Sequence, residues 1–171
     1  MIASIILQSA ALSLGYSERL LKDIAPETAA QMPQVDGKAI QANHPTFIFG
    51  HLSLYPSRIV VDLGGDATPI QPTDAYQTHF SPQATCQDDP NGNVYPTLDE
   101  VTSRYFAAMK LAIAAIEAAE DSAFAVENPN ERMRAKFATK GSMHNFYLGG
   151  HVMIHMGQLS TWRRVMGLGP A

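Results

Sequence analysis

Apolar residues recur every three or four positions along much of the chain, which is the spacing of helices that bury one face. Strand signals are weak. The only β-branched run, near Ile59–Leu63, continues the helical spacing of the residues before it, so we assign it to a helix. Four stretches keep this spacing long enough to be predicted as helices: residues 2–23, 43–65, 97–119 and 142–167.

The ends of these stretches carry residues that start and stop helices. Asn43 is the expected cap of the second helix, and Pro45 occupies its first turn. Thr97, followed three residues later by Glu100, forms a capping-box pattern at the start of the third helix. Pro56 lies inside the second helix and predicts a kink there, because proline has no N–H to donate.

Three connections join the helices. Residues 25–43 are predicted to be a connector with a short helical turn at Glu27–Met32, and residues 120–141 contain the turn sequence Asn-Pro-Asn. Residues 64–96 show no sustained period, so we expect a long loop that covers one end of the bundle or lies against a partner subunit. The pattern predicts an all-α fold, a four-helix bundle with long crossover loops, in a single domain of residues 1–171.

Composition narrows the class of protein. Hydrophobic residues make up 46% of the chain and charged residues 16%, so the chain has enough apolar surface to fold. The formal net charge of -4, without a basic run, argues against a nucleic-acid partner or an anionic membrane surface. The first predicted helix lacks a basic leading region and is interrupted by Ser4, Gln8 and Ser9, so we expect a core helix there, not a signal peptide or a membrane span. A single cysteine fits a reducing, cytoplasmic setting.

Two histidines lie one turn apart on the apolar face of the last predicted helix. His151 and His155 are spaced i, i+4, and imidazoles at this spacing can chelate one metal ion. His51 lies on the inward face of the second predicted helix, directly after Gly50, and is the expected third ligand. Three neutral imidazoles with an open fourth position are typical of catalytic sites for a divalent transition metal; Zn or Ni is preferred here, and Fe or Co would also fit. The same pattern also fits buried histidines that are held by hydrogen bonds without a metal.

Neighbouring residues argue against other sites. Val152 follows His151 where HExxH metalloproteases have a glutamate, and the Glu-x-x-His of di-iron bundles does not occur. The Asp-x-Asn-x-Asn pattern of residues 89–93 imitates a calcium loop, but Val94 occupies the position that requires glycine. Cys86 has no histidine or basic residue beside it in sequence, so an unreactive thiol is expected there.

Some residues near the three histidines are candidates for a substrate pocket. Arg58 lies two turns after His51 and suits a substrate carboxylate, or else reaches solvent from the helix edge. Gln158 follows His155 by three residues, so it is expected to orient that ligand, to contact substrate, or to mark the polar edge of the apolar face. The full set of pocket candidates is Tyr55, Arg58, Gln158 and Trp162.

The other histidines are expected outside the metal site. His144 is about 10 Å from His151 along a straight helix, too far to share an ion, so it is predicted to lie in the pocket wall, behind the ligands, or in the core. His44 falls at a helix start and His79 in a loop, and both are predicted to lie at the surface.

Two short motifs resemble those of the DinB/YfiT-like family of metal-binding four-helix bundles. They are the Gly50-His51-Leu52 phrase early in the second helix and the His-x3-His-x-Gly-Gln phrase that starts at His151 in the last helix. The resemblance extends to the helix layout and implies that His51, His151 and His155 are the metal ligands. It also implies a homodimer and, as partners, a small-molecule thiol and an electrophilic substrate. The chain departs from the common members of the family in its long 64–96 loop, in Pro56, and in residues 120–141.

Three hypotheses follow for the function. The first is a metal-dependent enzyme, either of the thiol-transferase type or a hydrolase. In the transferase the metal presents a thiol as thiolate to an electrophile, and in the hydrolase it activates water. The second is a non-catalytic metal-binding or stress-associated interaction module with the same fold and metal. The third is a bundle without a metal, in which the histidines are core residues.

Overall fold

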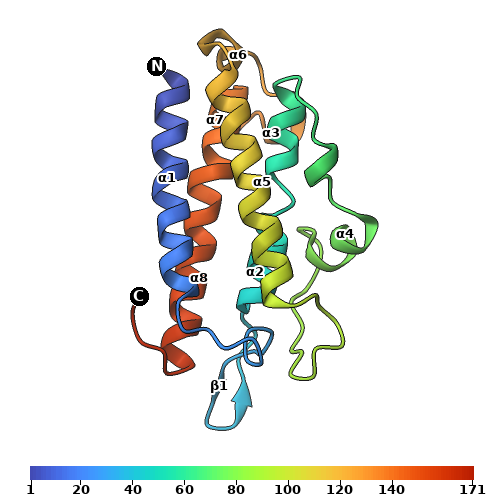
Figure 1. Cartoon of the computed structure of the whole chain (residues 1–171), viewed down its shortest axis with the longest axis vertical. Coiled ribbons are helices and arrows are strands. Elements are labelled where there is room, and N and C mark those ends of the chain that lie inside the picture. Colours follow the sequence, from blue (N-terminus) through green and yellow to red (C-terminus); the bar gives the residue numbers. More distant parts are fainter.

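A computed structural model describes residues 1–171, and most of these residues are helical, consistent with the predicted all-α class (Figure 1). The long helices α1 (Ile2–Leu21), α5 (Leu98–Ala118) and α8 (His151–Val165) run along the long axis of the molecule. Thr97 caps α5 as predicted, since its side chain accepts a hydrogen bond from the backbone N–H of Glu100 at 3.2 Å. Sequence periodicity therefore located the long helices well.

The last predicted helix begins slightly earlier than expected and contains an irregular turn. It consists of α7 (Lys140–Asn145), a π-helical turn η3 (Phe146–Gly150) and α8, which follow one another without a break. In the π-helical turn the N–H of His151 donates to the carbonyl of Phe146, five residues back. Thr139 and Ser142 form a reciprocal capping box at the start of α7.

The second predicted helix is two helices, which corrects the prediction of one kinked helix. Helix α2 spans Pro45–Leu52 and α3 spans Pro56–Asp62. Pro56 is the first residue of α3, a position where the missing N–H costs nothing, so the proline begins a new helix and does not bend an existing one. The cap of α2 is also not Asn43: Nδ1 of His44 accepts a hydrogen bond from the N–H of Phe47 at 3.1 Å.

The connections hold more structure than expected. The 25–43 connector contains a two-stranded hairpin, β1 (Gln34–Val35) and β2 (Lys38–Ala39). Its turn places Asp36 and Gly37 at φ values of 51° and 73°, the left-handed region that such hairpin turns require. The other two connections carry short helices: η1 (Thr68–Ile70) and α4 (Asp74–Phe80) in 64–96, and α6 (Asp121–Ala125) and η2 (Glu131–Met133) in 120–141.

One continuous cluster of buried apolar side chains lies between the helices. Helices α2 and α3 pack against α5, and α1 packs against η3, α7 and α8. Segment 64–96 runs beside the long helices and contributes buried side chains, among them Phe80 and Cys86, to this cluster. Its helix α4 packs on α2, the helix that carries His51. This contact places an irregular segment beside a predicted metal ligand.

Two further findings bear on the predictions. The Asp89 carboxylate accepts hydrogen bonds from the N–H groups of Asn93, Val94 and Tyr95 at 2.8–3.1 Å. It therefore organises a backbone turn. None of the helices combines the length and the apolar character that crossing a membrane requires.

Candidate metal centre

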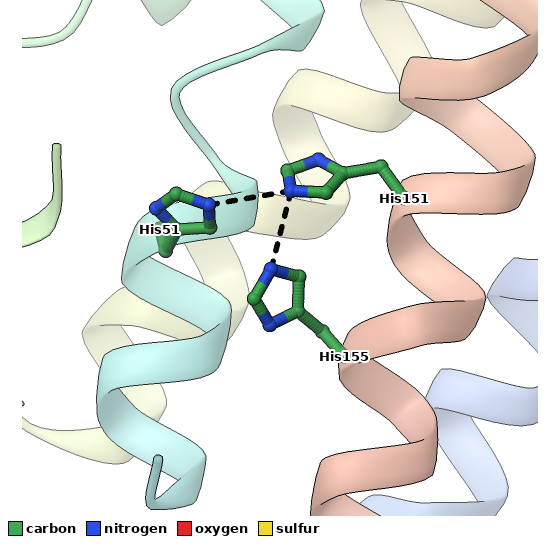
Figure 2. A group of neighbouring side chains, drawn as sticks. All are labelled: His51, His151 and His155. Carbon is green, nitrogen blue, oxygen red and sulfur yellow. Dashed lines mark hydrogen bonds between the residues drawn. The ribbon is translucent and has the colours of Figure 1, made fainter. Parts of the chain in front are cut away.

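Three histidine side chains from two helices converge on one point (Figure 2). Nε2 of His151 lies 3.3 Å from Nε2 of His51 and 3.1 Å from Nε2 of His155. His51 comes from α2, and the other two histidines come from successive turns of α8. The structure thus brings together the three residues that the sequence singled out as a group that could hold a metal ion.

The spacing of the three nitrogens suits a metal ion. Histidine nitrogens bind Zn at about 2.0–2.1 Å, and two such ligands in tetrahedral arrangement lie about 3.3 Å apart. The separations of His151 from the other two, 3.1 and 3.3 Å, are close to this value, and all three ligand atoms lie within 4.8 Å of one another. No Cys, Asp, Glu or further His belongs to the group. The protein therefore supplies three imidazole ligands, and a fourth position would be left to water or to a substrate.

Hydrogen bonds at the opposite ring nitrogens orient two of the three imidazoles. Nδ1–H of His51 donates to the backbone carbonyl of Phe80 at 2.6 Å, and Nδ1–H of His155 donates to Oε1 of Gln158 at 2.9 Å. The same Gln158 oxygen accepts a hydrogen bond from Nδ2 of Asn43 at 3.1 Å. Because Nδ1 carries the proton in both rings, each Nε2 is unprotonated and has a lone pair on the side of the common centre.

Burial keeps the three rings in the neutral form that binds metals. Their exposed fractions are 7% for His51, 9% for His151 and 8% for His155. Burial is the main cause that lowers the pKa of His51, the pKa of His151 to about 3 and the pKa of His155 to about 4. Nδ1 of His151 is buried and has no hydrogen-bond partner. At neutral pH all three imidazoles are uncharged.

The hydroxyl of Tyr55 lies at the same centre. It is 3.1 Å from Nε2 of His51, and the Tyr55 ring meets the His151 ring edge to face, with their centroids 4.5 Å apart. Burial raises the pKa of Tyr55 to about 12, so the hydroxyl keeps its proton and acts as a hydrogen-bond donor at neutral pH. A cavity of about 310 Å³ opens beside this group; the histidines share its wall with Asn43, Phe47, Tyr55, Ser81, Pro82 and Ala84.

Close packing at Gly50 makes the Phe80 contact possible. A Cβ atom at Gly50 would lie only 2.4 Å from Cε1 of the Phe80 ring, which is closer than non-bonded carbon atoms approach one another. Glycine therefore lets Phe80 sit directly on α2, and this position brings the Phe80 carbonyl to His51. The element that approaches Gly50 is the end of α4.

The irregular turn before His151 is also held in place by close contacts. Oγ of Ser13 donates a hydrogen bond of 2.5 Å to the carbonyl of Leu148, within the π-helical turn η3. A Cβ atom at Gly149 would lie 2.8 Å from Cβ of Ser9, so glycine allows α1 to pack tightly here. These contacts with α1 fix the point at which α8, with its two histidines, begins.

The predicted pocket residues have different surroundings. Tyr55 lines the histidine cavity and Gln158 orients His155. Arg58 does not line that cavity; its guanidinium lies over the Tyr55 ring, at the edge of a neighbouring cavity. Trp162 is buried and donates from Nε1 to the carbonyl of Gln31 at 2.8 Å, beside a third cavity. Substrate binding by these four residues stays a prediction.

Several residues at the site carried no sequence signal. The Phe80 carbonyl is a backbone group, so its side chain gives no hint of the hydrogen bond to His51. Ser81, Pro82 and Ala84 reach the cavity from a segment without periodicity. Asn43 was predicted only as a helix cap, although its side chain binds Gln158. A loop that folds over a helix cannot be placed from local spacing.

The remaining histidines lie away from the centre. His44 is fully buried, with Nε2 3.0 Å from the carbonyl of Gln87, so the prediction of a surface position was wrong. It was wrong because residues 81–95 fold over the start of α2. His144 is a core residue, one of the predicted alternatives, and its Nε2 lies 3.1 Å from Oδ2 of Asp62. His79 is half-buried against Phe80.

No family model, no curated protein and no solved structure matches this chain. What the chain does is therefore argued from the geometry and chemistry of its own residues.

Proposed function

We propose that this protein is a metal-dependent enzyme of the thiol-transferase type. His51, His151 and His155 would hold a divalent transition metal, with Zn or Ni preferred over Fe or Co. The observation that carries the proposal is the convergence of three Nε2 atoms at 3.1 and 3.3 Å, two of them on rings whose Nδ1–H is already bound elsewhere. A metal at this position would lower the pKa of a bound thiol and supply thiolate at neutral pH.

The residues around the centre have separate tasks. The Phe80 carbonyl and Gln158 hold the rings of His51 and His155 in the orientation that presents Nε2. The Tyr55 hydroxyl, which keeps its proton, can donate a hydrogen bond to an electronegative atom of a substrate in the cavity. The Phe47 and Tyr55 rings in the cavity wall limit the access of water to the reacting groups.

The cavity favours catalysis over a purely structural metal. A structural site has all its ligand positions filled by protein, whereas this group offers three imidazoles beside a cavity of about 310 Å³. The competing hypothesis, a non-catalytic metal-binding or stress-associated interaction module, requires that nothing bind in this cavity. A fourth ligand from the chain would support that hypothesis, and no further His, Cys, Asp or Glu side chain belongs to the group.

The proposal extends to the fold family and the assembly. We propose a four-helix bundle with long crossover loops, of the DinB/YfiT-like kind, built from α1, α2 with α3, α5, and α7 with α8. A homodimer is supported by exposed apolar side chains on neighbouring helices, including Ile5 (57% exposed) and Leu12 (63%) on α1 and Ile154 (57%) on α8. The single cysteine supports a cytoplasmic location.

The first test is elemental analysis of the protein purified without a histidine tag. We expect about one equivalent of a transition metal in the wild type. The double variant His151→Ala/His155→Ala should contain none, whereas His79→Ala, a histidine outside the group, should keep it. If the wild type neither contains nor takes up metal, the three histidines are core residues and the proposal of a metal site is wrong.

The second test links the metal to turnover. We expect His51→Ala to lose both its metal and its activity with low-molecular-weight thiols and electrophiles. Its circular dichroism should stay close to that of the wild type, because His51 lines a cavity and its truncation only widens that cavity. Thiol transfer that persists in metal-free His51→Ala protein would overturn the proposed function.

A further inference from the structure

A second cavity adjoins the metal centre through a pair of tyrosines. The rings of Tyr55 and Tyr147 lie 5.0 Å apart; Tyr55 lines the histidine cavity and Tyr147 lines the second one. The second cavity has a volume of about 240 Å³. Its polar lining consists of Ser57, Arg58, Asp62, Gln71, Asn128, Asn130 and Tyr147.

Arg58 is the cationic residue of this cavity, and most of its N–H groups have no partner within the protein. Arg58 lies over the ring of Tyr55, with Cζ 5.1 Å from the ring centroid, and Nη1 donates to the hydroxyl of Tyr147 at 3.4 Å. No carboxylate of the chain forms a salt bridge with Arg58. A guanidinium has five N–H donors, so most of those of Arg58 are available to a ligand.

The only carboxylate in the lining is already engaged. Oδ2 of Asp62 lies 3.1 Å from Nε2 of the buried His144. Lys140 does not line the cavity, but its ammonium donates to the backbone carbonyl of Asp62 at 2.6 Å, so a second positive charge lies behind this wall. Ser57, Gln71 and Asn130 contribute neutral polar groups. The cavity therefore suits an anion better than a cation.

Tyr55 connects this cation to the metal centre. Its hydroxyl is 3.1 Å from Nε2 of His51, and its ring carries the guanidinium of Arg58. The two binding points are therefore separated by about one tyrosine side chain. A small molecule with a reactive group at one end and an anion at the other could contact both.

We infer that the Arg58 cavity binds a carboxylate of the substrate whose other end reacts at the three histidines. The planar fork of Arg58 matches the two oxygens of a carboxylate, and an arginine–carboxylate pair of this kind gives both affinity and orientation. The inference rests on the proposed function for the reacting end, but the carboxylate site itself is a property of Arg58 and its neighbours. It assigns the substrate to the class of carboxylic acids.

The test compares two thiols of equal chain length, one ending in a carboxylate and the other in a neutral hydroxyl. Protein loaded with Co(II) is titrated with mercaptohexanoate and with its neutral analogue mercaptohexanol, and the sulfur-to-cobalt absorption band reports binding. In the wild type we expect the acid to bind about tenfold more tightly than the alcohol, as is typical of a charge-assisted contact. In Arg58→Gln this preference should disappear, while mercaptohexanol binds as it does in the wild type.

Two further variants sharpen the result. Arg58→Lys keeps the charge but not the fork, so it should retain only part of the preference. Arg164→Gln removes an exposed arginine near the end of α8 and should leave the preference unchanged. Circular dichroism of Arg58→Gln checks that loss of the contact with Tyr55 has not unfolded α3.

A calorimetric titration with hexanoate, which has no thiol, separates this inference from the proposed function. We expect hexanoate to bind the wild type about tenfold more tightly than it binds Arg58→Gln, whether or not metal is present. If neither thiol produces the absorption band, thiol binding at the metal fails, while the hexanoate result still decides on the Arg58 site. Equal hexanoate affinities in wild type and Arg58→Gln would overturn the inference.

Discussion

The backbone carbonyl of Phe80 accepts a hydrogen bond of 2.6 Å from Nδ1 of His51, although the two residues belong to different helices. This contact fixes which nitrogen of His51 faces the other two histidines. It exists because Phe80 packs directly on Gly50, where any side chain would collide with its ring. A segment without helical periodicity therefore orients a predicted metal ligand.

Gly50→Ala should disrupt this arrangement. The new Cβ would lie within 2.4–2.6 Å of three atoms of the Phe80 ring, so Phe80 must move away and its carbonyl with it. We expect a loss of about 1–3 kcal/mol in the free energy of unfolding, as is typical of overpacking. Metal affinity should fall about 10–100-fold, the usual cost of losing a partner that orients a ligand. Urea denaturation and a competitive metal titration measure the two effects.

Gly15→Ala is the matched control for that variant. Gly15 lies in α1, and a Cβ atom there would meet nothing within 4 Å. Alanine has a higher helix propensity than glycine, so this substitution should stabilise the protein by up to about 1 kcal/mol. Its metal affinity should equal that of the wild type. Similar losses of metal affinity in both variants would contradict a specific role for the Phe80 contact.

Gln158 should matter for metal affinity through its oxygen atom. Oε1 accepts the Nδ1–H of His155 at 2.9 Å, and the side chain is exposed enough that its replacement should not affect folding. We expect Gln158→Ala to bind metal about 10–100-fold more weakly than the wild type. Gln158→Glu keeps an oxygen acceptor and should bind more tightly than Gln158→Ala. Equal affinities of Gln158→Ala and wild type would show that His155 needs no partner.

His44 should make the protein sensitive to acid. Burial lowers the pKa of His44 from 6.5 to about 4, so the unfolded chain binds a proton here more readily than the folded chain does. The free energy of unfolding should therefore fall as the pH drops from 6.5 to about 4, and His44 should contribute about 3 kcal/mol of that fall. Denaturation midpoints across this pH range give the measurement.

His44→Asn isolates that contribution. Asparagine is a good helix cap, so it can still accept the N–H of Phe47, but it does not titrate. Loss of the Nε2 contact with Gln87 should cost about 1 kcal/mol at neutral pH. The acid-induced loss of stability should be smaller in this variant than in the wild type. An unchanged pH profile would mean that other groups cause the acid sensitivity.

Cys86 should resist thiol reagents in the folded protein. The residue is 4% exposed, and burial raises its pKa to about 11, from the ordinary thiol value of 9.0. Since only the thiolate reacts, the shift alone should slow modification at neutral pH about 100-fold. The reaction with a chromogenic disulfide should be slow in buffer and complete in denaturant. Fast modification of the native protein would contradict the buried position.

The helical spacing of apolar residues predicted those features of the site that depend on residues close together in the chain. The i, i+4 pair of His151 and His155, and the position of His51 on the inward face of its helix, follow from helical period alone. The break at Pro56 was missed because a proline inside an apolar period is compatible with both a kink and a new helix. The Phe80 carbonyl and the burial of His44 depend on where residues 64–96 fold, and long-range packing of an aperiodic segment leaves no pattern in its sequence.

The π-helical turn at Phe146–Gly150 changes the phase of the last helix. In a regular helix each residue advances by about 100°, so His144 and His151, seven residues apart, would share one face. The wider turn amounts to one inserted residue, so His144, which contacts Asp62, lies on a different face of the helix from the ligand pair. A single helix thus presents two differently oriented faces. Removal of one residue from the turn would restore the regular phase, and the ligand pair and the core histidine could no longer both keep their neighbours.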